Sequence, residues 1–230
     1  ISDSKKGTSN MNPQLVGVWE NMRDLGLCAL AHANRHAAYH SMKNEKWADF
    51  SVLQAAHAAE ILLKARIAQE HPLLIFDKFP PVSGDELSLE DLFEKGRTIE
   101  WNDLPARLWA TTGIKLSNLS LYREFGKIRN GIQHFAPMLK QPTSKMTLEF
   151  IFGVIDPFIH DCWGLYAVDY DEDYEPYVNF ISSLVNDEIL FLVSGEAARC
   201  EQYWNADWAK ASRVYREEMS RRIEKARSQP

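Results

Sequence analysis

Apolar residues recur every three or four positions through most of this chain, which is the spacing of one buried side of an α-helix. In the stretch from Leu121 to Phe135, the apolar residues are separated by alternating steps of four and three; they are Leu121, Phe125, Ile128, Ile132 and Phe135. A helix with one apolar stripe must bury that stripe against other elements. We therefore expect an all-α fold in which the stripe from Leu121 to Phe135 faces the core.

The same periodicity, bounded by glycine, proline and capping residues, predicts where the helices begin and end. The predicted helices cover residues 14–43, 47–70, 89–95, 104–112, 118–136, 146–168, 176–194 and 197–226. Within 176–194 the run EILFLV is also compatible with a strand. We expect helices 47–70 and 118–136 to pack side by side.

Breaks in this pattern suggest how the chain is organised. Prolines and a glycine interrupt residues 72–117, so this region is interpreted as an irregular insertion with short helices. The acidic run DYDEDYE at 169–175 resembles a linker, because like charges in a block favour an extended chain. The sequence thus predicts a helical domain at 12–168 and a C-terminal helical extension at 176–230.

The charge of the chain is unevenly distributed. The net charge of −6 argues against a protein whose whole surface binds nucleic acid. Residues 104–148, however, carry seven basic side chains and one acidic side chain, as a local footprint for phosphates would. The candidate RNA contacts in this window are Arg123, Lys127, Lys140 and Lys145. The alternative is a solvated basic face on an acidic protein.

The basic window contains the run Arg129-Asn130-Gly131-Ile132-Gln133-His134. An arginine followed five positions later by a histidine occurs three times in the chain, so that spacing alone is weak. When an asparagine must also follow the arginine, composition predicts about 0.02 chance occurrences. Only Arg129 meets this stricter pattern.

The stretch KIRNGIQHF, residues 127–135, resembles the signature helix of HEPN domains, written R-x(4–6)-H with a polar residue often after the arginine. The earlier stretch HAAEILLKA, from His57 to Ala65, resembles the second helix of that family, in which a glutamate, here Glu60, faces inward. The resemblance spans roughly 14–168. It implies a compact antiparallel helical bundle that acts as a homodimer, and many members are metal-independent ribonucleases of toxin–antitoxin, phage-defence or RNA-processing systems. Other members only bind.

The residues of the motif suit chemistry on a phosphodiester. His134 is a candidate general acid or base for attack by the RNA 2′-OH, and Arg129 can hold two phosphate oxygens. Asn130 lies one helical turn before His134 and can orient its imidazole. Five helical residues correspond to roughly 140° of rotation and about 7.5 Å of rise, so Arg129 and His134 do not point the same way. Arg129 must therefore bend round with its long side chain or serve a composite site, and the resemblance to HEPN domains implies the second, since their dimers bring two such helices together.

Glu60 lies on an apolar stripe of helix 47–70, so its carboxylate needs a partner. Lys64, four residues later, is one candidate, and an arginine from another helix is the other. This leaves a structural alternative to catalysis, in which Arg129 is an ion-pair partner of Glu60 and His134 is an ordinary helix-end residue.

The other candidate sites are weaker. Cys28, His32, His36 and His40 recur every four residues, but His32 and His40 would lie about 12 Å apart along a helix, too far to share one ion. We therefore predict no metal and no cofactor. Asp156 and His160 are interpreted as a local hydrogen-bonded pair.

Three cysteines without metal-like spacing favour free thiols in the cytoplasm, and no apolar run reaches the ~18 residues that a membrane span needs. The leading hypothesis is a metal-independent endoribonuclease, plausible as a toxin or phage-defence effector with an antitoxin or regulatory protein as partner. The alternative is a non-catalytic module of the same fold that binds RNA, binds a protein through the helix carrying Trp204 and Trp208, or serves as an adaptor or oligomerisation domain.

Overall fold

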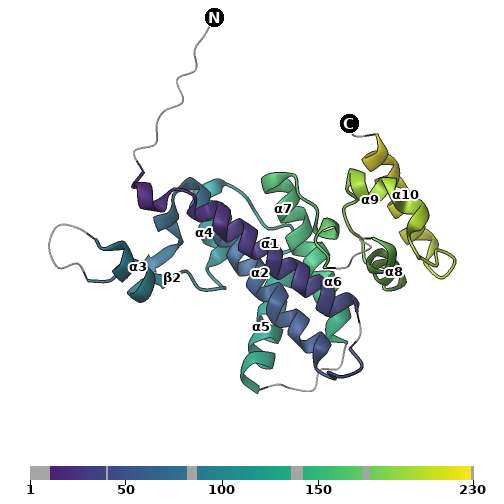
Figure 1. Ribbon diagram of the computed structural model, residues 1–230, viewed down its shortest axis with the longest axis horizontal. Coiled ribbons are helices and arrows are strands. Elements are labelled where there is room, and N and C mark those ends of the chain that lie inside the picture. The colour runs from purple at the N-terminus through teal and green to yellow at the C-terminus, as the bar shows by residue number, and fades with distance from the viewer. Residues whose placement is uncertain (1–10, 40, 82–86, 136–141, 173–176, 229–230) are drawn as a thin grey trace, which may run out of the picture.

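A computed structural model of the protein describes residues 11–39, 41–81, 87–135, 142–172 and 177–228 (Figure 1). The described chain is mostly helical, as predicted, with one small two-stranded hairpin. The larger helices of the first part are α1 (Val18–Ala38), α2 (Trp47–Glu70), α4 (Leu104–Thr112), α5 (Leu119–Phe135), α6 (Thr143–Phe150) and α7 (Asp156–Trp163).

Helices α1 and α2 lie along one another at the centre of the molecule (Figure 1). Their contact is built from small side chains, with Ala33, Ala55 and Ala59 all essentially inaccessible to solvent. At Gly26 a Cβ atom would lie only 2.7 Å from Cγ of Leu62, so a larger residue there would push the helices apart. Small residues therefore set how closely these two helices approach.

Helix α5 packs against α2, so the expected pairing of helices 47–70 and 118–136 is confirmed. Its buried side carries Tyr122 and Phe125, and the Phe125 ring stacks on that of Phe150 with centroids 3.8 Å apart. The expected burial of Phe135 is wrong, because this side chain at the helix end is 85% exposed. The apolar side of α5 is therefore buried in the first part of the helix and exposed to solvent at its C-terminal end.

The insertion contains a hairpin that the sequence analysis did not predict. A 3₁₀ turn (Pro72–Ile75) leads into β1 (Phe76–Lys78), which pairs antiparallel with β2 (Arg97–Thr98). Helix α3 (Leu89–Lys95) lies between the two strands in the sequence and confirms the helix predicted at 89–95. Its first turn is capped by the Ser88 hydroxyl, which accepts a hydrogen bond from the backbone N–H of Asp91.

The predicted single helix at 146–168 is wrong in two respects. A π-helical turn (Ile151–Ile155) separates α6 from α7, and α7 ends at Trp163, where Gly164 adopts φ +68°. Pro157 explains the interruption, because proline has no N–H to donate to the carbonyl four residues earlier and its ring clashes with that carbonyl. That carbonyl, on Gly153, instead accepts a hydrogen bond from the Ser117 hydroxyl at 3.1 Å.

The first predicted helix, 14–43, is also shorter than expected. It is divided into a 3₁₀ turn (Pro13–Leu15) and α1, because Gly17 adopts φ +82° and stands outside the helical region as the N-cap. At the other end α1 stops at Ala38, where Tyr39 is extended.

The C-terminal extension departs most from the prediction. In place of helix 176–194 there is α8 (Val178–Asn186), followed by an irregular run, and Glu188 there has φ +53°. In place of one helix at 197–226 there are α9 (Gly195–Arg199), a 3₁₀ turn (Glu201–Tyr203) and α10 (Arg213–Arg227). Ser212 is the N-cap of α10, and its hydroxyl accepts a hydrogen bond from the backbone N–H of Tyr215. The Glu188 carboxylate fixes this cap by accepting hydrogen bonds from both the N–H and the O–H of Ser212.

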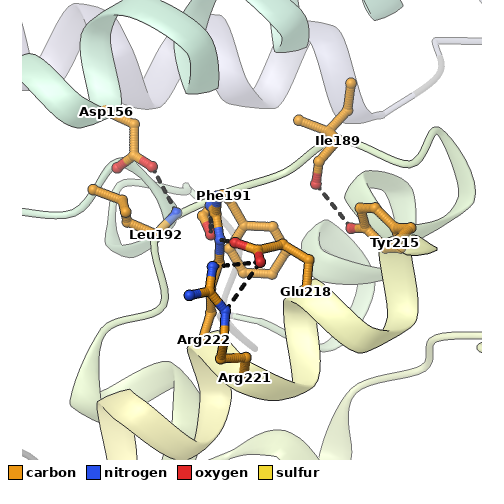
Figure 2. Close-up of polar contacts among 8 residues, drawn as sticks. All are labelled: Asp156, Ile189, Phe191, Leu192, Tyr215, Glu218, Arg221 and Arg222. Carbon is orange, nitrogen blue, oxygen red and sulfur yellow. Dashed lines mark hydrogen bonds and ion pairs between the residues drawn. The ribbon is translucent and has the colours of Figure 1, made fainter. Parts of the chain in front are cut away.

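Helices α8, α9 and α10 gather at one end of the molecule, opposite α3 (Figure 1). Figure 2 shows how the run before α9 is held between α7 and α10 by side chains that bind its backbone. The Tyr215 hydroxyl donates to the Ile189 carbonyl and the Arg222 guanidinium donates to the Phe191 carbonyl, both at 2.8 Å. These bonds satisfy backbone groups that would otherwise lack partners in a segment outside helix or sheet.

Candidate functional site

Glu60 lies on α2 with its side chain only 23% exposed, and both of the partners considered for it are present. Its Oε1 is 2.7 Å from Nζ of Lys64, and its Oε2 is 3.4 Å from Nη2 of Arg129 on α5. The buried Lys64 ammonium also donates to the Thr98 hydroxyl of β2 at 3.0 Å. The carboxylate therefore links α2 to α5 and, through Lys64, to the hairpin.

Arg129 is held from three sides. Besides Glu60, its Nη1 donates to Oδ1 of Asn130 at 2.9 Å. Its guanidinium carbon lies 5.9 Å from the ring centroid of Trp101, within the range of a cation–π contact. Trp101 is in turn fixed by Tyr122, whose ring stacks on it at 4.2 Å and whose hydroxyl donates to the Trp101 carbonyl. The arginine therefore occupies a preset position.

A polar pocket of about 500 Å³ opens beside this ion pair. Its lining comprises Glu60, Trp101, Asn102, Arg129, Asn130 and residues 96–100 of the hairpin. Two arginines and two glutamates line it, and Arg97 pairs with Glu100 as Arg129 pairs with Glu60. Within one chain the positive charge of the pocket is therefore balanced.

Tyr122 supports this arrangement through its contacts with Trp101. Burial, and secondly the Glu60 carboxylate, raise the pKa of its phenol, whereas the Arg129 cation lowers it. Tyr122 is thus a neutral hydrogen-bond donor to the Trp101 carbonyl and supports the site without titrating.

His134 lies in the last turn of α5, exposed to solvent, and is not among the residues that line the pocket. Its ring is 6.4 Å from that of Phe135, edge-on. Arg129 and His134 thus point in different directions, as their five-residue spacing predicted. One copy of the chain brings Glu60, Arg129 and Asn130 together and leaves His134 apart.

The predicted RNA contacts fall on two surfaces. Arg123 and Lys127 are exposed on α5 and line a common depression of about 440 Å³. Lys145, exposed on α6, instead lines a pocket with the acidic side chains Glu149, Asp187 and Glu188. Lys140 lies outside the described residues.

The histidine stripe of α1 has structural contacts. The His36 ring lies 4.0 Å from the Trp47 ring, and its Nδ1 is hydrogen-bonded to the His32 carbonyl. His32 lies 3.3 Å from the Glu172 carboxylate, and His40 is outside the described residues. In the part of the chain that the structure describes, no three His, Cys, Asp or Glu side chains are grouped to hold a metal ion.

The predicted pairing of Asp156 with His160 is wrong. The Asp156 carboxylate accepts backbone hydrogen bonds from Ala167 and Leu192 instead, and Nδ1 of His160 is buried with no hydrogen-bond partner in the described structure. Asp156 is buried next to the backbone N–H groups of Ala167 and Leu192, which have no other acceptor in the described chain. Because each buried N–H needs an acceptor, the carboxylate binds these two groups and not His160. Among the described helices none is long and apolar enough to cross a membrane.

Sequence reasoning missed Trp101 and Thr98, which complete the site. Neither lies on a periodic stripe, and Thr98 belongs to a two-residue strand that has no recognisable sequence signal. Comparison with known proteins adds no assignment, because no family model, curated protein or solved structure matches the chain.

Proposed function

We propose that this protein is an RNA endonuclease of the HEPN type, with Arg129 and His134 of α5 as its principal catalytic groups. The observation that carries the proposal is the fixed position of Arg129. Glu60, Asn130 and Trp101 hold its side chain at the edge of a polar pocket. The same helix also carries His134, which is exposed to solvent. A preset guanidinium and an accessible imidazole are the groups that phosphodiester cleavage requires.

In this proposal the nucleophile belongs to the substrate. The ribose 2′-oxygen attacks the adjacent phosphorus, its proton passes to a base, and the bond to the 5′-oxygen breaks as that oxygen gains a proton. His134 serves as the general base or acid, while the Arg129 guanidinium stabilises charge on the phosphate oxygens. The products are a 2′,3′-cyclic phosphate and a 5′-hydroxyl. The chemistry needs no metal ion, and the 2′-OH selects RNA over DNA.

A homodimer follows from the divergence of these two side chains. Two α5 helices meeting near a two-fold axis bring the Arg129 of one copy toward the His134 of the other. The exposed Phe135 beside His134 gives that end of the helix an apolar surface to bury in such a contact. Sedimentation at tens of micromolar, a concentration that populates typical specific dimers, should show a dimer; a monomer there would count against the composite site.

The direct test is cleavage of RNA by the purified protein in EDTA. His134→Ala should lower the rate by ~10²-fold or more, as expected for loss of a general acid or base. His32→Ala is the matched control, because it removes another solvent-accessible histidine, one on α1 whose ring contacts Glu172. Analysis of the product ends should find cyclic phosphates. Equal cleavage by wild type and His134→Ala would contradict the proposed role.

The second candidate is a non-catalytic RNA-binding or protein-interaction module of the same fold. The observation in its favour is the charge balance at the pocket, where Glu60 and Glu100 pair with Arg129 and Arg97. RNA binding by the wild-type protein without cleavage would support this candidate. An antitoxin-like or regulatory partner protein is compatible with either candidate.

A further inference from the structure

Trp109 on α4 is a large aromatic side chain that the core does not use. It is 55% exposed, whereas Leu104 and Leu108 on the same helix are completely buried. The indole lines a mainly apolar pocket of about 340 Å³ between α4 and the start of α5, together with Pro105, Ala106, Leu116 and Leu119. An apolar hollow walled by an accessible aromatic ring suits a flat ring as its occupant.

Positive charges surround this hollow. Lys115, Arg123 and the neutral Asn102 complete its lining, and Arg123 also lines the neighbouring depression with Lys127. Among the described residues none of these three cations forms an ion pair, and the two depressions contain one acidic residue, Glu124. Since these cations are free to meet an external anion, the surface around Trp109 is complementary to a negatively charged ligand.

The polar face of α5 that carries Arg123 and Lys127 continues to the Arg129–His134 motif. Arg123, Lys127, Asn130 and His134 follow one another at steps of four, three and four, so they share one face of the helix over roughly 16 Å. All four are exposed, while Arg129 is turned aside to Glu60. This face therefore leads directly from the Trp109 hollow to His134.

We propose that this surface binds single-stranded RNA, with one base stacked on Trp109 and the phosphate backbone following Arg123 and Lys127 toward His134. A mainly apolar hollow walled by an indole and flanked by cations matches a nucleotide, which joins a flat base to an anionic phosphate. A base inside a duplex has its faces covered, so the site selects unpaired RNA. The inference rests on the proposed function for its end point at His134, and adds how the substrate is held and in what form.

The test measures binding of a labelled single-stranded RNA of about 12 nucleotides, within the usual site sizes of such proteins, by full-length protein carrying His134→Ala to prevent cleavage. Trp109→Ala in that background should weaken binding by roughly 5- to 150-fold, the range expected for loss of one base–aromatic stack. Trp109→Phe keeps an aromatic face and should retain most of the affinity. A duplex of the same sequence should bind less well and respond little to Trp109→Ala.

Salt dependence separates stacking from charge. Arg123→Gln should reduce the slope of log affinity against log salt by about 0.7, the value per phosphate contact on a single strand. Trp109→Ala should lower affinity at every salt concentration and leave that slope unchanged. Lys210→Gln, which removes an exposed charge from the C-terminal extension, is the matched control and should alter neither quantity.

Two outcomes distinguish this inference from the proposed function. If His134→Ala abolishes cleavage but Trp109→Ala binds RNA as tightly as its parent, the catalytic proposal stands and the stacking site is overturned. If Trp109→Ala loses binding while the wild-type protein cleaves nothing, the stacking site stands and catalysis fails. Absence of single-stranded RNA binding by the parent protein, or capture of a protein at this surface in its place, overturns the inference.

Discussion

The Asp156 carboxylate accepts a hydrogen bond from the backbone N–H of Leu192 at 2.8 Å and so joins α7 to the segment that precedes α9 (Figure 2). Its other oxygen accepts from Ala167 N–H, also at 2.8 Å. The side chain is completely buried, and this burial raises its pKa to about 7 even though the two hydrogen bonds lower it. A carboxyl group with ordinary exposure would titrate near 4, so Asp156 has a distinct signature in the pH dependence of stability.

We predict that the destabilisation caused by Asp156→Asn shrinks as the pH rises from about 4 to 7. The folded protein holds this proton more tightly than the unfolded chain, so the contribution of Asp156 is fully present below the unfolded pKa. It is lost as the pH rises through the folded pKa. Urea unfolding of both proteins across this range measures the difference, and the effects of other titrating groups such as Asp169 largely cancel because both proteins contain them.

Asp161→Asn is the control, because Asp161 is an exposed carboxylate on the same helix. Its effect on stability should be within about 0.5 kcal/mol at every pH. A cost of Asp156→Asn that grows between pH 4 and 7 would show that the folded pKa is lowered, and would contradict the dominance of burial.

Helices were predictable from sequence wherever one apolar stripe met local boundary signals. The predicted helix at 104–112 matches α4, which Gly113 ends in a left-handed conformation, and residues 47–70 match α2. The break between α9 and α10 was not predictable, because Trp204 and later apolar residues keep helical spacing across it. What separates the two helices is a tertiary contact, in which the Glu188 carboxylate binds Ser212 and α10 begins after it.

The candidate site was likewise predictable only where its residues lie on periodic helices. The position of Glu60 on an apolar stripe required a partner, and the structure supplies both Lys64 and Arg129. The aromatic support from Trp101 depends on a hairpin of very short strands, which has no periodic pattern to read. Sequence therefore identified the Glu60, Lys64 and Arg129 group, but not the Arg97–Glu100 pair of the pocket or the indole that orients Arg129.

We predict that Gly126→Ala destabilises the protein, although alanine is intrinsically the better helix former. A Cβ at this position would overlap Nε1 of Trp101 and lie 2.9 Å from its Cδ1. The indole is not free to move, because the Tyr122 ring stacks on it at 4.2 Å and the Tyr122 hydroxyl donates a hydrogen bond to the Trp101 carbonyl. Overpacking of this kind typically costs about 1–3 kcal/mol, measurable as a lower midpoint of urea unfolding.

Gly195→Ala is the matched comparison. The nearest atom to a Cβ there is the flexible end of Arg199, 3.5 Å away, so alanine should be tolerated or slightly stabilising. If Gly126→Ala is as stable as Gly195→Ala, the close approach of α5 to Trp101 is not present in solution.

We predict that Glu60→Gln costs about 1–3 kcal/mol, because it leaves the Lys64 ammonium without a counter-charge in a largely buried position. The loss should be smaller in the double variant Glu60→Gln, Lys64→Met, where the uncompensated charge is gone and the apolar stem remains. Chemical unfolding of both single variants and the double variant gives the coupling energy. Independent, additive costs would mean that the 2.7 Å ion pair contributes nothing to folding.

We predict that Arg129→Lys lowers RNA cleavage by tenfold or more, about 1.4 kcal/mol in the barrier, with little change in stability. The pair with Glu60 is long, at 3.4 Å, and both side chains are about a quarter exposed, so its loss should cost at most about 1 kcal/mol. Lysine keeps the positive charge but lacks the planar fork, which binds Asn130 and under the proposed function would hold a phosphate at the same time. Single-turnover cleavage and urea unfolding of the same preparation separate the two effects. Unchanged cleavage would show that only charge is needed at this position, whereas a matching loss of stability would make Arg129 a structural residue.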